Sequence, residues 1–421
     1  MSAGELVGEP VTAPPWRPLD LPPAPPVRGQ VRADVAIVGA GLTGLATAHH
    51  LLRRDPSLDI VVLDATAPAG GASGRGTGLV GPRIGPPIDR ARQRFGDDTA
   101  RACHLASEDW VRQTVALARE LEAEPGVDCG LDVAGQLVVA RTDRAAADLA
   151  RRADAYRRLD LDVRALPRPD GYRAALRYPV AATLDPAALT TALAADLARR
   201  GVRRHDRSPV LRAGGGLLEC PGGTVRARRT VLAVNGWART LRLPVGTVAA
   251  LQLHAVATEP LSAADRAALG REAVIDATTL APYHRLTPDG RLVMGGGPVR
   301  IPPTSRPASH RRAWDWLARR LPVQARVTHR WTGRVGYTGD ALPVVGRTDE
   351  STWFAGGCCG HGLALATATG AHLAAALTGD APTPRPWHRD RAPWLPVDGP
   401  AGTLIRGYLR VLANQAGKQP Y

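Results

Sequence analysis

The fold is decided by residues 34–64, which read DVAIVGAGLTGLATAHHLLRRDPSLDIVVLD. The mostly β-branched run Val35–Val38 predicts a strand, and Ile60–Leu63 predicts a second one. A glycine turn and a helical pattern that runs to about Arg54 lie between them. This order predicts a βαβ unit of the kind that binds dinucleotides.

The glycine turn has the spacing GxGxxG, and each glycine has a separate role in that motif. Gly39 allows the tight turn, Gly41 lets the backbone approach a pyrophosphate, and Gly44 packs the helix against the strand. Leu42 and Thr43 begin the predicted helix, where backbone N–H groups are free to bind an anion. We therefore predict that all five residues bind the cofactor.

Asp64 ends the second predicted strand, twenty residues after Gly44. At this spacing a carboxylate can accept hydrogen bonds from the ribose hydroxyls of an adenosine half. The motif by itself is compatible with either NAD or FAD.

A second glycine cluster follows Asp64 and includes Ala72, Ser73, Gly74, Arg75 and, slightly later, Gly78. Small residues allow an extended ligand to approach closely. The Ser73 hydroxyl can bond a phosphate, and the Arg75 guanidinium can neutralise one.

A third cluster, WFAGGCCGHG at residues 353–362, lies between a predicted strand, 352–355, and a predicted helix, 363–377. A strand, a glycine turn and a helix N-terminus together form an anion site, which at a flavin would stabilise negative charge on the reduced ring. NAD enzymes need no second element of this kind, so the pattern favours FAD. The predicted cofactor contacts here are Gly357, Cys359, Gly360, His361 and Gly362.

In order, DVAIVGAGLTGL, GGASGRGTG, YHRLT…GGG at 283–297, Trp331…DALPVVG and GGCCGHGLAL resemble the D-amino-acid-oxidase superfamily of flavoproteins. The chain is most similar to the branch of glycine/sarcosine oxidases and γ-glutamylputrescine oxidases, from Asp34 to about Gly379. The resemblance implies an α/β FAD-binding domain of Rossmann type and a mainly antiparallel substrate domain, the arrangement called glutathione-reductase-2-like. It also implies oxidation of a C–N bond, with hydride passing to flavin N5 and oxygen usually reoxidising the flavin.

The resemblance also implies site residues. Val210 and Asp340 join the predicted cofactor contacts, and the candidate catalytic residues are Tyr283, His284, Arg285 and Arg334. The positions at which covalent flavin is attached in some branches hold neither cysteine nor histidine here, so we expect noncovalent FAD. Amino-acid oxidases of this type hold the substrate carboxylate with an arginine four residues after the tryptophan of the Trp331 motif. That position is Val335 here and its neighbour is Arg334, so the sequence favours an amine as substrate at least as much as an amino acid.

Several assignments leave alternatives open. His361 is expected to contact the cofactor through its backbone rather than to act as a catalytic side chain, and one of Cys358 and Cys359 is expected to line the flavin pocket. Residues 283–285 alternate along a predicted strand, so one face meets the flavin cavity and the other the core, with structural and catalytic roles about even. Besides an oxidase, the chain could be an FAD dehydrogenase that uses a quinone or protein acceptor, or a flavoprotein retained as a non-catalytic assembly factor.

Composition excludes other classes of protein. The chain has 421 residues, 44% hydrophobic, with a net charge of +15 that comes almost wholly from scattered arginines. No aromatic residues interleave with them as a base-stacking surface would require, so we expect no nucleic-acid partner. Five cysteines without repeating spacing predict neither a disulfide framework nor a metal site. No segment is apolar for long enough to cross a bilayer and no signal peptide is visible, so we expect a cytoplasmic protein.

The predicted domain organisation is discontinuous. Residues 1–32 form a Pro-rich arm, and residues 381–421 form a tail with a helix at about 402–413. The FAD-binding domain takes residues 33–105, 180–250 and 335–380. The substrate-binding domain takes residues 106–179 and 251–334.

Overall fold

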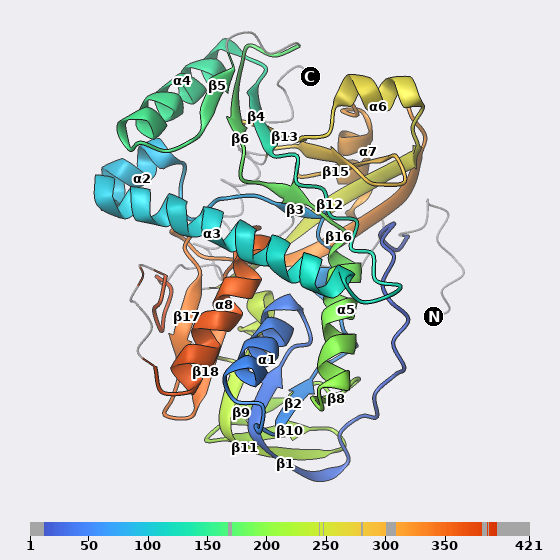
Figure 1. Ribbon diagram of the computed structural model, residues 1–421, viewed down its shortest axis with the longest axis vertical. Coiled ribbons are helices and arrows are strands. Elements are labelled where there is room, and N and C mark those ends of the chain that lie inside the picture. Colours follow the sequence, from blue (N-terminus) through green and yellow to red (C-terminus); the bar gives the residue numbers. More distant parts are fainter. Residues whose placement is uncertain are drawn as a thin grey trace.

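The structure, a computed structural model, describes residues 12–166, 171–243, 245–246, 248–278, 281–299, 309–380, 385 and 387–393. Two large sheets form its two halves, and the long helix α3 (Asp97–Glu122) crosses between them (Figure 1). The lower half in this view contains the predicted βαβ unit. The upper half contains the long antiparallel strands.

The first sheet has the strand order β17-β18-β11-β1-β2-β8. Strands β18, β11, β1, β2 and β8 are parallel to one another, and β17 is an antiparallel edge. All four residues of β2 are buried, as expected for a parallel strand covered on both faces. The strands of this sheet are β1 (Gly29–Val38), β2 (Ile60–Leu63), β8 (Arg203–His205), β11 (Gly223–Leu232), β17 (Val344–Arg347) and β18 (Thr352–Gly356), with the hairpin β9 (Arg212–Gly214) and β10 (Leu217–Cys220) attached to β11.

Three helices lie in front of this sheet in Figure 1: α1 (Leu42–Arg54), α5 (Pro186–Arg199) and α8 (Gly362–Leu377). Small residues let α1 and α8 pack closely, since a Cβ on Gly370 would lie 2.6 Å from the backbone of Ala46. Together they bury the main hydrophobic core, which includes Leu45, Leu51 and Leu373. The interlocked α1 and α8 fix the relative positions of their two N-termini.

The second sheet has the order β16-β12-β15-β14-β13-β4-β6-β5 and is antiparallel except for the pair β13–β4. Helix α7 (Arg311–Ala318) covers one face, where Trp314 and Trp316 pack with Val256 and Met294. The opposite face is turned toward the first half of the molecule, because Trp331 of β16 bonds the loop after Ser73. The strands are β4 (Gln136–Ala140), β5 (Arg164–Leu166), β6 (Ala174–Tyr178), β12 (Ala249–Pro260), β13 (Ala273–Asp276), β14 (Tyr283–Leu286), β15 (Arg291–Gly295) and β16 (Val327–Tyr337).

Smaller elements complete the described chain. They are α2 (Ile88–Phe95), α4 (Asp143–Arg158), α6 (Ala263–Leu269), the pair β3 (Leu79–Val80) and β7 (Ala182–Thr183), and the 3-10 turns η1 (Ala72–Gly74) and η2 (Asn235–Trp237). The described part of the Pro-rich arm lies against the body. Its Leu19 and Val27 amides donate hydrogen bonds to the side-chain hydroxyls of Thr191 and Ser208. Trp16 of this arm packs edge-on against Trp331.

The fold class predicted from the sequence agrees with this architecture, with local corrections. Strand β11 is continuous over ten residues, Gly223–Leu232, because it pairs along the length of β1. Helices α2 and α3 are separated by Gly96, whose φ of +81° ends α2 and precedes α3. The predicted boundary between residues 105 and 106 therefore falls inside α3. The predicted helix at 402–413 lies outside the described residues.

Candidate active site

The carboxyl ends of β18, β11 and β1 lie side by side, because these strands are neighbours in a parallel sheet. The turns that follow them are 356–362, 233–237 and 39–44. Ligands of open α/β sheets bind at this edge. Sequence motifs more than three hundred residues apart are therefore assembled into one site.

The glycine turn after β1 has the geometry that the motif predicts. Gly39 has a φ of +110°, and a Cβ there would lie 2.7 Å from the carbonyl oxygen of Ala233. A Cβ on Gly44 would clash with the carbonyl of Gly39, so the helix can pack against the strand only with glycine there. A Cβ on Gly41 would meet only the Ser73 side chain, at 3.0 Å from its Oγ. Apart from the Ser73 side chain, nothing in the described chain lies within 4 Å of this Cβ position, so a ligand explains the glycine better than protein packing does.

The N-terminus of α1 is prepared for an anion. Its N-cap, Gly41, provides no side-chain cap, and the first turn contains no acidic residue. The Leu42 amide donates to Ser73 Oγ at 2.8 Å, so the hydroxyl lies at the helix start. Asp64 accepts from the Ala40 amide at 2.8 Å and from the Thr66 amide at 2.7 Å, and it has further lone pairs. The donors at the helix start fit a pyrophosphate, and the acceptors of Asp64 fit the adenosine ribose of a dinucleotide.

Arg75 connects the Ser73 loop to the second sheet. Its Nε donates to the carbonyl oxygen of Thr332 at 2.6 Å, and Trp331 Nε1 donates to the carbonyl oxygen of Arg75 at 3.0 Å. These two bonds tie the Ser73 loop to the second sheet. Arg75 thus joins the two halves of the site, and phosphate binding by its guanidinium stays a prediction. Gly78, with a φ of +84°, has no room for a side chain beside Leu184 and Arg285.

The second glycine turn depends on Asn235, a residue that the sequence motifs did not identify. Asn235 Oδ1 accepts from the Gly357 amide at 2.9 Å, and its backbone has a φ of +41°. The amide of Cys359 donates to the carbonyl oxygen of Gly336 at 3.0 Å. The turn is thus held by η2, which follows β11, on one side and by β16 on the other. An Asn-Gly pair directly after a parallel strand was the only signal in the sequence.

The adjacent cysteines point to different partners. Cys359 is buried, and its thiol contacts the Gly357 carbonyl at 3.1 Å and Thr338 Oγ1 at 3.5 Å. Cys358 is less buried, and its sulfur lies 3.4 Å from Asn235 Nδ2 and near Gly362 at the start of α8. Burial raises the pKa of both thiols. Because Cys358 is less buried and lies near the start of α8, we prefer it over the predicted Cys359 as the thiol that borders the ligand.

His361 is the N-cap of α8 and makes no side-chain cap. Its backbone amide donates to the Cys358 carbonyl oxygen at 2.9 Å. Burial, with a contribution from Arg83, lowers the pKa of its imidazole to about 3, so the ring is neutral near pH 7. A backbone role beside the cofactor stays a prediction for His361, as it does for Gly360.

Strand β14 separates its three candidate residues onto two faces. Tyr283 and Arg285 face the first half of the molecule, whereas His284 is buried on the other face, where burial and Arg141 lower its pKa to about 4. The Arg285 guanidinium is 1% exposed and donates to the carbonyl oxygens of Thr77, Leu184 and Leu286 at 2.7, 2.7 and 3.2 Å. Burial lowers its pKa to about 10. Only Tyr283 keeps a place among the groups that can meet a substrate.

Strand β16 gives the same separation for Arg334. Trp331, Gly333, Val335 and Tyr337 alternate onto the face that meets the Ser73 loop and the start of α8, since a Cβ on Gly333 would lie 3.6 Å from the Arg75 carbonyl oxygen. A Cβ on Gly360 would likewise lie 3.1 Å from the Tyr337 hydroxyl. Arg334 occupies the other face, with its guanidinium 3.6 Å from the ring centroid of Trp237.

The remaining predicted contacts surround this site. Asp340 lies in the loop after β16, and its carboxylate accepts two bonds from Arg389, at 2.5 and 2.9 Å. Val210 lies between β8 and β9 and packs against the core behind the first sheet. Sequence reasoning missed Asn235, Tyr337 and Arg389, none of which belongs to a local motif.

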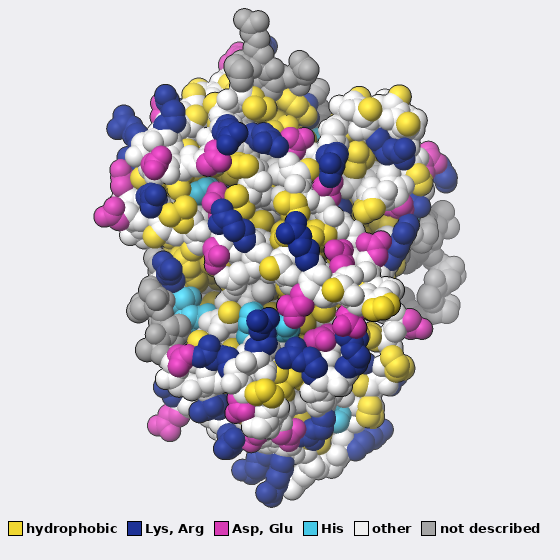
Figure 2. Space-filling model, viewed as in Figure 1, with side chains coloured by type: hydrophobic (Ala, Val, Ile, Leu, Met, Phe, Trp, Pro, Cys, Tyr) yellow, Lys and Arg dark blue, Asp and Glu magenta, His cyan; other side chains and the backbone are white. Residues whose placement is uncertain are grey.

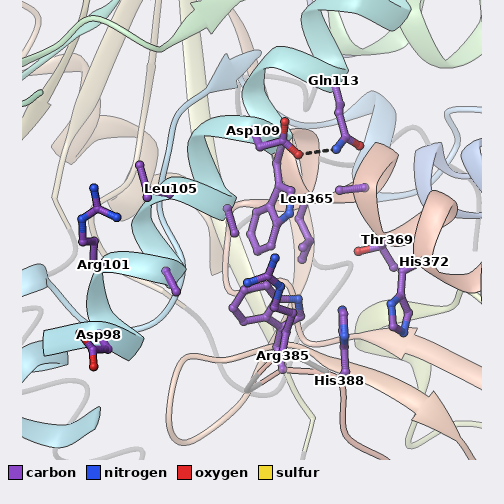
Figure 3. A pocket seen from close by; sticks show the side chains of 15 residues that line it. Asp98, Arg101, Leu105, Asp109, Gln113, Leu365, Thr369, His372, Arg385 and His388 are labelled. Atoms are coloured by element: carbon purple, nitrogen blue, oxygen red, sulfur yellow. Dashed lines mark hydrogen bonds between the residues drawn. The ribbon is translucent and has the colours of Figure 1, made fainter. Parts of the chain in front are cut away.

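A cavity of about 670 Å³ lies apart from the glycine turns, between α3, α8 and residues 385–388. Figure 3 shows Arg385 and His388 across from α3, with His388 beside His372 of α8. The rings of His372 and His388 lie 3.5 Å apart between centroids. None of the glycines that form the two turns lines this cavity, so we do not assign the cofactor to it.

Charged side chains on the face seen in Figure 2 are scattered, with arginines and acidic residues intermixed. Among the described residues no group of three or more histidine, cysteine or acidic side chains could hold a metal ion. In the same part of the chain no helix is long and apolar enough to cross a membrane.

Comparison with known proteins identifies the family of the chain. A family model described as DAO, FAD dependent oxidoreductase, matches residues 34–376. The chain is 29% identical to γ-glutamylputrescine oxidoreductase of Escherichia coli K12 over 378 residues, which covers 83% of this chain and 85% of the relative. It is 27% identical over 230 residues to glycine oxidase of Geobacillus kaustophilus, which covers 51% of this chain and 58% of that enzyme.

Solved structures show the same fold. The crystal structure of the Geobacillus kaustophilus glycine oxidase has a TM-score of 0.70 at 23% identity, covering 84% of this chain and 96% of that chain. The L-proline dehydrogenase from P. horikoshii has a TM-score of 0.67 at 19% identity, covering 90% and 99%. A Rossmann-type cofactor domain joined to a second sheet is thus the arrangement in all three.

Proposed function

The chain belongs to the DAO family of FAD-dependent oxidoreductases, and we propose that it oxidises a carbon–nitrogen bond of an amine that carries no α-carboxylate. FAD, when bound noncovalently between the two glycine turns, supplies the acceptor for the hydride. The product imine hydrolyses in water, and oxygen is the acceptor that we propose for reoxidation. The names of γ-glutamylputrescine oxidoreductase and glycine oxidase are compatible with either an amine or an amino acid.

The observation that carries the choice of an amine is the geometry of β16. The position at which related amino-acid oxidases place a carboxylate-binding arginine is Val335, which lies on the face turned toward the Ser73 loop. Arg334 lies on the opposite face, stacked on Trp237. Arg285 uses its donors on backbone carbonyls. Neither of the two candidate arginines, Arg285 and Arg334, is therefore placed to hold an α-carboxylate.

The side chains on this face suit a neutral amine. Leu251 and Leu253 of β12 pair with Val335 and Gly333, which gives an apolar wall. Burial raises the pKa of Tyr283 and of Tyr337, so both hydroxyls stay protonated near pH 7 and can bond an amine nitrogen. The same dry surroundings disfavour an ammonium ion, so the substrate amine loses its proton on entry. Hydride transfer from a neutral amine needs no strong protein base.

The test compares paired substrates with and without an α-carboxylate. We expect wild type and Arg334→Ala to prefer the amine member equally. The change Val335→Arg introduces a buried cation on the cavity face, and it should shift kcat/KM toward the carboxylate member by roughly 30-fold or more, since such a contact contributes about 2–5 kcal/mol.

Steady-state kinetics and anaerobic bleaching of the flavin provide the readouts. Wild type that prefers glycine, sarcosine or a D-amino acid, with Arg334→Ala abolishing the preference, would contradict the proposed pocket. Hydrogen peroxide formed with an amine supports oxygen as acceptor. Bleaching without peroxide supports a dehydrogenase, and no bleaching by any amine, amino acid or imino acid supports a non-catalytic flavoprotein.

A further inference from the structure

We propose that Arg389, outside the region matched by the family model, is a positioning residue that holds the loop 338–343 against the second glycine turn and thereby sets the affinity for FAD. The matched region ends at residue 376. Residues 387–393 bond to β17 of the first sheet through the Val345 and Arg347 amides. The inference rests on the proposal that this loop and turn border the flavin. The experiment below distinguishes failure of the inference about Arg389 from failure of that proposal.

Arg389 makes four bonds to the loop. Its two terminal nitrogens donate to the Asp340 carboxylate at 2.5 and 2.9 Å, Nη2 donates to the Leu342 carbonyl oxygen at 2.7 Å, and Nε donates to the Pro343 carbonyl oxygen at 3.1 Å. A bidentate guanidinium–carboxylate pair is geometrically specific, and a lysine could not replace the whole set. The Arg389 side chain thus forms hydrogen bonds with three residues of the loop.

The loop passes this constraint to the glycine turn. Thr338 Oγ1 donates to the Leu342 carbonyl oxygen at 2.7 Å and lies 3.5 Å from Cys359 Sγ. A Cβ on Gly357 would lie 2.7 Å from Thr338 Cγ2, so turn and loop are in direct contact. Burial by itself raises the pKa of Asp340, but the bonds from Arg389 and from the Leu342 amide outweigh it, and the net pKa is lowered. The carboxylate is therefore ionised when it accepts these bonds.

The segment that carries Arg389 is itself firmly attached. Trp387 is 3% exposed and packs edge-on against Trp110 of α3. Its carbonyl oxygen accepts from the Val345 amide, and Asp390 Oδ1 accepts from the Arg347 amide at 2.8 Å. The Ala392 amide donates to the Val245 carbonyl oxygen at 2.8 Å. These contacts give Arg389 a fixed base from which to hold the loop.

The experiment measures FAD dissociation constants of Arg389→Ala, Arg389→Lys and the matched control Arg391→Ala, an exposed neighbour, by flavin fluorescence. We expect Arg389→Ala to weaken FAD roughly 10-fold to 100-fold, the size of effect seen when groups that orient direct ligands are removed. Arg389→Lys should fall between, and Arg391→Ala should stay within about twofold of wild type. Methylguanidinium at low millimolar concentration should partly restore FAD binding to Arg389→Ala.

Two further readouts distinguish positioning from general stability. The visible spectrum and midpoint potential of bound flavin should change in Arg389→Ala and not in Arg391→Ala. Asp340→Asn should weaken FAD, and the double variant Arg389→Ala/Asp340→Asn should be no weaker than the worse single variant. Unchanged FAD affinity and spectrum in Arg389→Ala, with melting temperatures of apoprotein and holoprotein lowered equally, would overturn the inference. If Asp340→Asn also leaves FAD unaffected, the placement of the flavin beside this loop fails as well.

Discussion

The two glycine turns look alike in sequence, but different parts of the chain hold them in place. At the first turn, after β1, the side chains that hold the turn, Asp64 and Ser73, lie within residues 34–75, as do the glycines; the contact of Gly39 with the Ala233 carbonyl oxygen comes from a neighbouring strand. At the second, after β18, the turn is held by Asn235 of η2 and Gly336 of β16, and its neighbouring loop by Arg389. A local motif can specify the first turn alone. The second exists only once the whole fold has formed.

This difference predicts different failures when each turn is altered. At the first turn a substitution can remove the ligand without disturbing the fold. At the second turn, the same change affects packing and ligand together.

The largest effect is expected from Gly41→Val. A side chain at this position enters the space left for the pyrophosphate and meets only the flexible Ser73 hydroxyl within the protein. FAD should bind at least about 100-fold more weakly, since two or more charge-assisted hydrogen bonds, each about 1.5–3 kcal/mol, are lost. The apoprotein should fold, as checked by circular dichroism and melting temperature.

Gly214→Val serves as the control, because a Cβ on this β9 residue meets no atom within 4 Å. Purified Gly41→Val that is as yellow as Gly214→Val would show that the pyrophosphate does not lie at this turn.

A smaller and mixed effect is expected from Asn235→Gly. This change keeps the positive φ accessible but removes the acceptor for the Gly357 amide. The unpaired amide should cost about 1–3 kcal/mol in the apoprotein, and FAD should bind roughly 10-fold more weakly because the turn loosens. Thermal melts without FAD measure the loss of apoprotein stability, and melts with FAD measure the loss of FAD binding. Asn235→Asp retains an acceptor and should recover apoprotein stability. If Asn235→Gly instead had normal stability and weak FAD binding, the second turn would behave like the first, where ligand binding can be lost without disturbing the fold.

The contrast explains what the sequence could predict. The GxGxxG turn, the Asp64 spacing and the strands of β14–β15 were predictable because their signals lie within a few dozen residues. The side-chain orientations on β14 and β16 were not, since alternation separates Tyr283 from His284 without telling which face is covered by α7. Arg75 was predicted to bind a phosphate because it is a cation in a glycine cluster, and Arg285 was a candidate catalytic residue because of the family resemblance. In the structure, backbone carbonyls of distant segments take their hydrogen bonds.

The two turns also differ in titratable groups, and this difference gives the smallest predicted effect. The N-cap of α1 is Gly41, whereas the N-cap of α8 is His361, whose pKa burial and Arg83 lower from 6.5 to about 3. A histidine with a lowered folded-state pKa leaves stability complete above pH 6.5. As the pH falls below that value, the unfolded chain gains a proton that the folded protein does not take up until about pH 3, so stability decreases.

Between about pH 7.5 and about pH 5.5 this one group should cost roughly 1 kcal/mol, allowing for its partial exposure, or about 2 °C in melting temperature. The spectrum of bound flavin should stay constant over the same range, because the imidazole beside it stays neutral. His361→Gln removes the proton-binding group, so its melting temperature should depend less on pH than that of wild type. A flavin spectrum that titrates near pH 6.5 in wild type and not in His361→Gln would instead mean that His361 is protonated beside the cofactor, and that the second turn, unlike the first, responds to pH.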